Sequence, residues 1–161
     1  MINKKSILSV LLFSLLIIAG CKEEETAVVP APTKTALLSA SPWITTAITI
    51  SPGLDLGGII ITDIYALSDA CDNDNLAIYK NDGTGNYDEG TTKCDPLDPQ
   101  TSAFNWSFNA DETQLIEDGQ TIYTINELSA TSMKLGDSFD GAEIGATPGT
   151  TYTVTITLKH Q

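Results

Sequence analysis

Apolar and polar residues alternate along several segments between Trp43 and the C-terminus. In the last of these segments, Tyr152, Val154, Ile156 and Leu158 alternate with threonines. Alternation with a period of two residues is typical of a β-strand that buries one face. Segments of this kind, separated by turns rich in Gly, Asn and Asp, predict an all-β domain.

The same alternation places aromatic residues on one face of a strand at 104–108. Phe104, Trp106 and Phe108 fall on one side of this strand, and polar residues fall on the other. Together with Trp43 they are candidates for lining an apolar pocket that holds a small ligand. They could equally fill a core, because an eight-stranded barrel is just wide enough for either arrangement.

Counting from Trp43, the pattern predicts eight strands, most of them joined by tight turns such as Asn-Asp-Gly at 81–83. Strands joined in this way pair with their neighbours in sequence. They favour an antiparallel up-and-down barrel, whose closure removes exposed edges, with a two-sheet sandwich as the alternative. One short helix is expected at 34–40, a further helical segment at 60–70, and a glycine-rich loop at 136–149.

The N-terminus has the layout of a secretory signal peptide. Lys4 and Lys5 precede a short apolar run that ends in Ile-Ala-Gly-Cys at 18–21. The run is shorter than the roughly 20 residues that a transmembrane helix needs. Residues 18–21 resemble the bacterial lipobox, which implies that Cys21 is acylated and anchors the mature chain to a membrane. The alternative is a secreted protein in which Cys21 has no role.

These features divide the chain into a signal peptide at 1–20, an acidic, proline-containing tether at 21–36 and a barrel domain at 37–161. The Lys-Glu-Glu-Glu run at 22–25 resembles the surface-export signal of lipoproteins from the Bacteroidetes. A solvated tether repelled by anionic headgroups would have the same composition. We therefore expect a lipid-anchored protein of the outer membrane. Both the cell surface and the periplasm stay open as the side on which it lies.

Charge excludes one class of partner. The 161 residues carry a formal net charge of −13, and loss of residues 1–20 leaves six lysines against 21 acidic residues, or −15. The chain contains no arginine. Because phosphate contacts need Lys and Arg, we expect no nucleic-acid partner. The negative charge weakly favours cationic partners.

Cys71 and Cys94 remain in the exported chain, so a disulfide between them is the default expectation. Two thiols binding a metal would be the alternative, but His160, the only histidine, lies at the far C-terminus. A Ser-His-Asp or Cys-His catalytic arrangement is nearly excluded for the same reason. The acidic residues around 81–83 do not have the spacing of an EF-hand loop. We therefore expect no enzyme activity, no cofactor and no metal.

The order of the motifs resembles the lipocalin-like domains of small Bacteroidetes lipoproteins. The resemblance implies an eight-stranded barrel bridged by Cys71 and Cys94, and it implies no established activity. Lipocalins proper carry Gly-x-Trp on the first strand, where this chain has Ser41-Pro42-Trp43. The matching pieces are Leu37-Leu38 before Trp43, Ala-Cys-Asp-Asn-Asp-Asn at 70–75, Lys-Asn-Asp-Gly-Thr at 80–84, Cys94, Trp-Ser-Phe at 106–108 and Tyr-Thr-Ile-Asn-Glu-Leu-Ser at 123–129.

The sequence therefore predicts a membrane-anchored, non-enzymatic binding module with a lipocalin-like barrel, which binds either a small apolar ligand inside the barrel or a macromolecule at its loops. The alternative is a structural or protein-interaction lipoprotein, such as an envelope accessory subunit or an inhibitor of a cationic protein. The barrel pattern and the inward aromatic residues favour the first hypothesis, and the acidic charge and the tether favour the second.

Replacing Cys21 with Ala removes the only group on which the predicted anchor depends. We expect Cys21→Ala to shift the protein from the membrane fraction to the soluble fraction of fractionated cells, as detected by immunoblotting. Continued sedimentation of the variant with membranes would contradict the anchor.

Overall fold

The structure is a computed structural model that describes residues 30–161. The signal peptide, Cys21 and most of the predicted tether lie outside the described residues. Residues 31–161 form one compact unit, and every element below belongs to it. No helix in the described part of the chain is long and apolar enough to cross a membrane.

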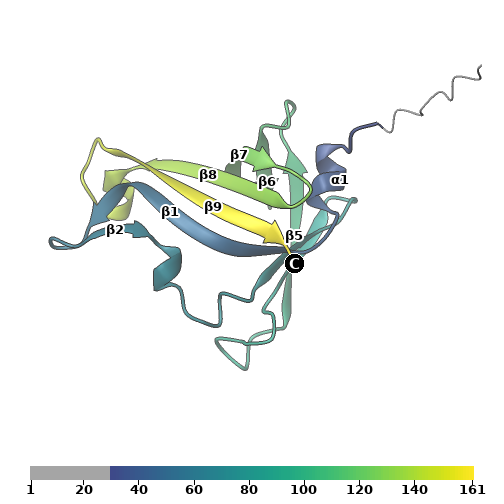
Figure 1. The fold of residues 1–161 in the computed structure, drawn as a ribbon, viewed down its shortest axis with the longest axis horizontal. Helices are drawn as coiled ribbons and strands as arrows, with labels where there is room; N and C mark the ends of the chain where they lie inside the picture. Colours follow the sequence, from purple (N-terminus) through teal and green to yellow (C-terminus); the bar gives the residue numbers. More distant parts are fainter. Residues whose placement is uncertain (1–29) are drawn as a thin grey trace, which may run out of the picture. The chain divides into compact units, whose positions relative to one another are not determined.

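An antiparallel barrel forms the body of residues 31–161 (Figure 1). Consecutive strands pair from β3 to β9, β1 pairs with β3, and β1 also pairs with β9, which closes the barrel with eight strands. The structure describes one further strand, β2, which lies outside the closed barrel and pairs with β1 alone. This confirms the predicted up-and-down barrel and excludes the sandwich. The strands are β1 (Trp43–Asp55), β2 (Ile60–Asp63), β3 (Leu76–Tyr79), β4 (Thr84–Asp88), β5 (Thr101–Phe108), β6 (Gln114–Glu117), β7 (Thr121–Leu128), β8 (Ser132–Asp140) and β9 (Thr151–His160).

The alternation seen in the sequence matches the burial of side chains along the strands. On β5, Phe104 and Trp106 are buried while their neighbours are exposed. On β9, Tyr152 and Leu158 are buried and the threonines at 151 and 153 are exposed. Burial of one face against the barrel interior is the main source of stability for such strands.

A single helix, α1 (Lys34–Leu38), covers one end of the barrel. Its N-cap is Thr33, whose hydroxyl accepts a hydrogen bond from the backbone nitrogen of Ala36. Such a cap supplies a partner for one of the free amide groups in the first turn. Five residues form too short a helix to be stable alone. Its position must therefore come from tertiary contacts.

Trp43 makes one of these contacts. Its side chain is fully buried, and its indole Nε1 donates a 2.7 Å hydrogen bond to the carbonyl oxygen of Leu38, which is also fully buried. The same end of the barrel holds the β3–β4 and β5–β6 turns. Ser39 donates a hydrogen bond to Asn81 in the first turn, and Lys34 donates one to the carbonyl of Glu112 in the second. Together these contacts close this end.

Two glycines meet specific backbone requirements on the β3–β4 hairpin. Gly83 has φ of +84°, the left-handed conformation that the predicted turn needs. Gly85 lies under the ring of Phe104 on β5, so close that a Cβ atom would be 2.3 Å from the ring carbon Cζ. Because no other residue leaves this space, Gly85 allows the ring to lie across the sheet.

Two local expectations were wrong. Residues 60–70 do not form a helix, because Ile60 and Ile61 pair with the long strand β1 and form β2, and only the 3-10 turn η1 (Tyr65–Leu67) is helical. The loop expected at 136–149 is shorter, because β8 continues to Asp140 along β9. A second 3-10 turn, η2 (Gly141–Ile144), follows and is capped by the Asp140 side chain.

Replacing Trp43 with Phe keeps one aromatic ring at this position and removes the hydrogen bond that joins the start of β1 to α1. We expect Trp43→Phe to lower the free energy of unfolding by about 1–3 kcal/mol, because the Leu38 carbonyl loses its buried partner. Urea denaturation measures this difference. An unchanged midpoint would show that the α1–Trp43 contact contributes nothing to stability.

Candidate functional site

The barrel contains a cavity of about 210 Å³. Its wall is mostly aliphatic and aromatic, and one of its lining residues, Tyr87, is 41% exposed. The size is below the roughly 300–1,000 Å³ of common ligand pockets. It exceeds the roughly 150 Å³ engineered cavity that admits benzene. The lining residues are Trp43, Thr45, Asn75, Leu76, Ala77, Tyr79, Tyr87, Glu117, Tyr123, Leu135, Ile156 and Leu158.

The cavity extends away from the end that α1 covers. Trp43 pairs with Ala77, and the next residue of β1 pairs with Leu76 at the start of β3. From there the cavity continues to Asn75 in the preceding loop and to Glu117 at the end of β6. One end of the barrel is thus packed around α1 and the other holds the cavity.

Glu117 is the one buried charged residue in the described part of the chain, with 6% of its surface exposed. The Tyr79 hydroxyl donates a 2.6 Å hydrogen bond to Oε1 of this carboxylate. The Tyr87 hydroxyl donates to the other oxygen, Oε2. Each carboxylate oxygen therefore has one phenol partner, and the group lies at the boundary between the cavity and the packed aromatic core.

The tyrosines around Glu117 hold their protons more tightly than free tyrosine. Burial raises the pKa of Tyr79 well above the ordinary value of 10.0, and the charge of Glu117 raises it further. Burial also raises the pKa of Tyr87, followed by the hydrogen bond and charge of Glu117. The pKa of Tyr123 is raised by burial first and then by Glu117 and Asp137. All three hydroxyls therefore remain hydrogen-bond donors at neutral pH.

The aromatic residues singled out in the sequence have two different positions. Trp43 lines the cavity. Phe104 and Trp106 are buried in the core, where Tyr79 packs edge-on against both rings at centroid distances of 5.3 and 5.8 Å. Phe108 packs edge-on against Trp106. These three residues fill the barrel, and none of them belongs to the cavity wall.

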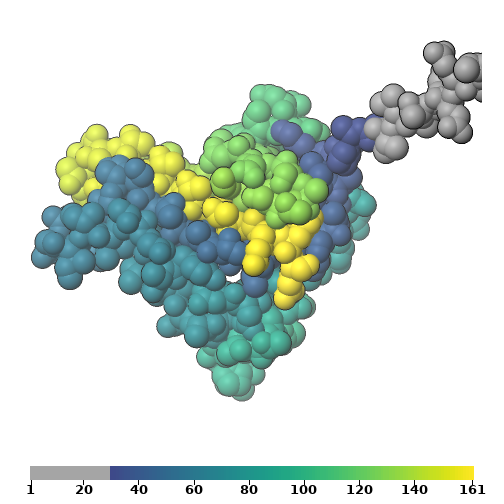
Figure 2. Space-filling model, viewed as in Figure 1, coloured from purple at the N-terminus to yellow at the C-terminus, as the bar shows by residue number. Residues whose placement is uncertain are grey.

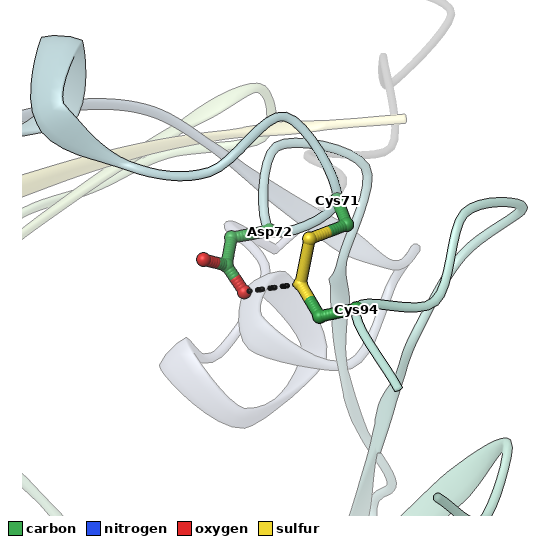
Figure 3. Close-up of side chains that lie close together, drawn as sticks. All are labelled: Cys71, Asp72 and Cys94. Atoms are coloured by element: carbon green, nitrogen blue, oxygen red, sulfur yellow. Dashed lines mark hydrogen bonds between the residues drawn. A yellow bond between two sulfur atoms is a disulfide. The ribbon is translucent and has the colours of Figure 1, made fainter. Parts of the chain in front are cut away.

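A disulfide between Cys71 and Cys94 joins the loops before β3 and before β5 (Figure 3). The Cα atoms lie 5.2 Å apart, within the usual range for such a bridge. This confirms the expected pair. The Asp72 Oδ1 atom lies 3.5 Å from the Cys94 sulfur. Because a disulfide sulfur carries no proton and no thiolate charge, this contact is neither a hydrogen bond nor a metal site.

Asp74 joins the same two loops that the disulfide connects. Its Oδ2 atom accepts hydrogen bonds from the Thr91 and Thr92 backbone nitrogens and from the Thr91 hydroxyl. The hydrogen bonds from Thr91 lower the pKa of this carboxyl. Asp82 lies at the opposite end of the hairpin, where it accepts hydrogen bonds from Thr84. The acidic residues around the hairpin thus serve as local turn and loop partners.

The sequence-based list of site residues lacks Glu117 and its tyrosine partners. A signal for Glu117 exists, since the alternation on β6 places it on the same face as Leu115, which is fully buried. The contacts with Tyr79 and Tyr87 come from β3 and β4, 38 and 30 residues away in sequence. No spacing rule connects residues at such separations.

Comparison with known proteins adds no family to this description. No protein-family model matches the chain. A search of curated proteins likewise returns no significant match. The closed eight-stranded barrel is consistent with a lipocalin-like fold.

The raised pKa values predict how stability depends on pH. Because Tyr79, Tyr87 and Tyr123 are harder to ionise when folded, their contribution is complete below pH 10 and is lost as pH rises above it. Each such tyrosine lowers the free energy of unfolding by up to about 1.4 kcal/mol per pH unit in that range.

We expect Tyr79→Phe to make this decline less steep, as measured by urea denaturation between about pH 9 and about pH 11. Because the comparison uses the slope, it is independent of the stability that the variant loses at neutral pH. Identical slopes for the variant and the wild type would contradict the assignment.

Proposed function

We propose that this chain is a non-enzymatic binding module, anchored by lipid to the bacterial envelope, that takes a small and largely apolar molecule into its barrel. The observation that carries the proposal is the cavity of about 210 Å³, which remains beside a core that is otherwise filled. A barrel with one packed end and one hollow end has the form of a container.

Support for the anchor comes from the sequence. The charged start, the apolar run and the lipobox at 18–21 occur in the order found in bacterial lipoproteins. The succession of motifs from Leu37 to Leu158 resembles lipocalin-like lipoproteins of the Bacteroidetes. Acyl chains on Cys21 would hold the barrel at an envelope surface, where the acidic residues 23–25 separate it from the membrane.

Support for a function without catalysis comes from the cavity wall. His160, the only histidine in the sequence, packs its ring against Trp43 with centroids 3.9 Å apart and lies outside the wall. Glu117 is the single carboxylate among the residues that line the cavity. A second carboxylate, which glycoside hydrolysis needs, is not among them.

A second candidate function, the inhibition or binding of a cationic protein, is favoured by one surface. The β1–β2 turn and the segment after β8 lie beside each other at the left of Figure 2 and flank a shallow groove. Leu56, Ile59 and Ile60 are each more than 60% exposed there, next to Asp55 and Asp63. Apolar and acidic residues together suit a partner with a cationic, partly apolar face.

The variant Thr45→Trp separates the two candidates. Thr45 lines the cavity, and an indole at this position would occupy most of it. We expect native mass spectrometry of the full chain, purified from its own cells, to detect a bound small molecule on the wild type and not on Thr45→Trp. A surface that binds protein would be unaffected by this change.

Thr49→Trp is the matched control, because Thr49 lies on the same strand with an exposed side chain. It should keep the bound molecule. A wild-type chain that carries no small molecule and binds no single-ring compound would contradict the container function.

A further inference from the structure

Glu117 has no cationic partner within the barrel. In the part of the chain that the structure describes, the one ion pair joins Lys134 to Glu127, whose side chains are 45% and 39% exposed. No lysine is among the residues that line the cavity. A buried carboxylate without a countercharge is expensive, because hydrogen bonds replace only part of its lost hydration.

The two phenol hydrogen bonds leave this carboxylate with unused capacity. Tyr79 donates to Oε1 and Tyr87 donates to Oε2. A carboxylate offers about four acceptor sites, so about two remain free. Since Glu117 lines the cavity, these sites are available to a group that enters it. Both hydroxyls donate their single hydrogen to Glu117, so neither has a hydrogen left to donate to an anionic ligand.

Aromatic residues form a large part of the cavity wall, and two of them donate hydrogen bonds to Glu117. Trp43, Tyr79, Tyr87 and Tyr123 all contribute to it. A cation over the face of such rings is attracted by their quadrupoles, and the attraction is largest where water is excluded. The aliphatic residues Leu135, Ile156 and Leu158 form another part of the wall and suit an apolar group. The cavity thus combines a site for a positive charge with space for a hydrocarbon ring.

We propose that the ligand of this cavity is a small organic ammonium, with its charged nitrogen on Glu117 and a single apolar ring against the aliphatic wall. This inference rests on the proposed container function and specifies its ligand. Three observations carry it together: the buried carboxylate without a countercharge, the aromatic residues around it, and a volume suited to one ring. A purely apolar ligand would leave the carboxylate further desolvated and still unpaired.

The net charge of the whole chain also favours a cationic ligand. The sequence carries a formal net charge of −13 and no arginine. A field of this sign concentrates cations near the surface and speeds their entry into a negative site. Anionic ligands would be repelled both by this field and by Glu117.

The test compares two single-ring probes that differ in charge, phenethylammonium and 2-phenylethanol. Calorimetric titration at neutral pH uses the full chain, purified in an uncharged detergent. We expect wild-type protein to bind the ammonium at least tenfold more tightly than the alcohol, which corresponds to about 1.4 kcal/mol. Glu117→Gln should remove this preference while it keeps the affinity for 2-phenylethanol.

Glu127→Gln is the matched control. It removes the same charge from a half-exposed position on β7, outside the cavity wall, and should keep the preference. The wild-type comparison of the two probes needs no variant, so it remains decisive if Glu117→Gln fails to fold.

The outcomes distinguish the two proposals. Equal affinity of the wild type for both probes would overturn the ammonium ligand and leave the container function intact. Equal loss of preference in Glu117→Gln and Glu127→Gln would also overturn it, because the effect would then arise from net charge. Binding of neither probe by the wild type would overturn the ammonium ligand and count against the container itself.

Discussion

The pairing of β1 with β9 is the constraint on which the rest of the structure depends. It joins the first strand to the last, from Trp43 opposite His160 to Ser51 opposite Thr153, and so turns a meander of strands into a closed barrel. An extra residue, Thr46, interrupts the register, and its hydroxyl donates a hydrogen bond to the carbonyl of Thr157. Such a bulge increases the local bend of a strand. In the closed barrel, Trp43 shares one core with buried residues of β3, β5 and β8.

The two ends of the closed barrel differ: one is packed around α1, and the other holds the cavity. Trp43 contacts α1 through Leu38 on one side and lines the cavity on the other. Phe104 and Trp106 fill the middle together with Tyr79. Tyr79 then donates its hydroxyl hydrogen to Glu117, so a single side chain joins the packed core to the polar edge of the cavity. The hollow end is therefore held in shape by the same aromatic residues that fill the other part.

Much of the fold could be predicted from the sequence, because strict alternation on β5 and β9 and the Asn-Asp-Gly turn are local signals. The disulfide could be predicted from the expectation of export, which leaves Cys71 and Cys94 to pair with each other. The strand β2 could not be predicted, since Ile60 and Ile61 become a strand only because β1 extends far enough to pair with them. The cavity wall was predicted only at Trp43. Glu117 is one of 21 acidic residues, and its burial depends on tyrosines from two other strands that meet it only after closure.

The central claim is that Glu117 faces an open interior site and binds a positive charge there. A crystal structure of the full chain grown with phenethylammonium tests this claim most directly. The account predicts density for the probe inside the barrel, with its nitrogen within hydrogen-bond distance of a Glu117 carboxylate oxygen and its ring beside Leu158 and Trp43. A cavity filled by rearranged side chains, or a probe bound with its nitrogen directed away from Glu117, would contradict it.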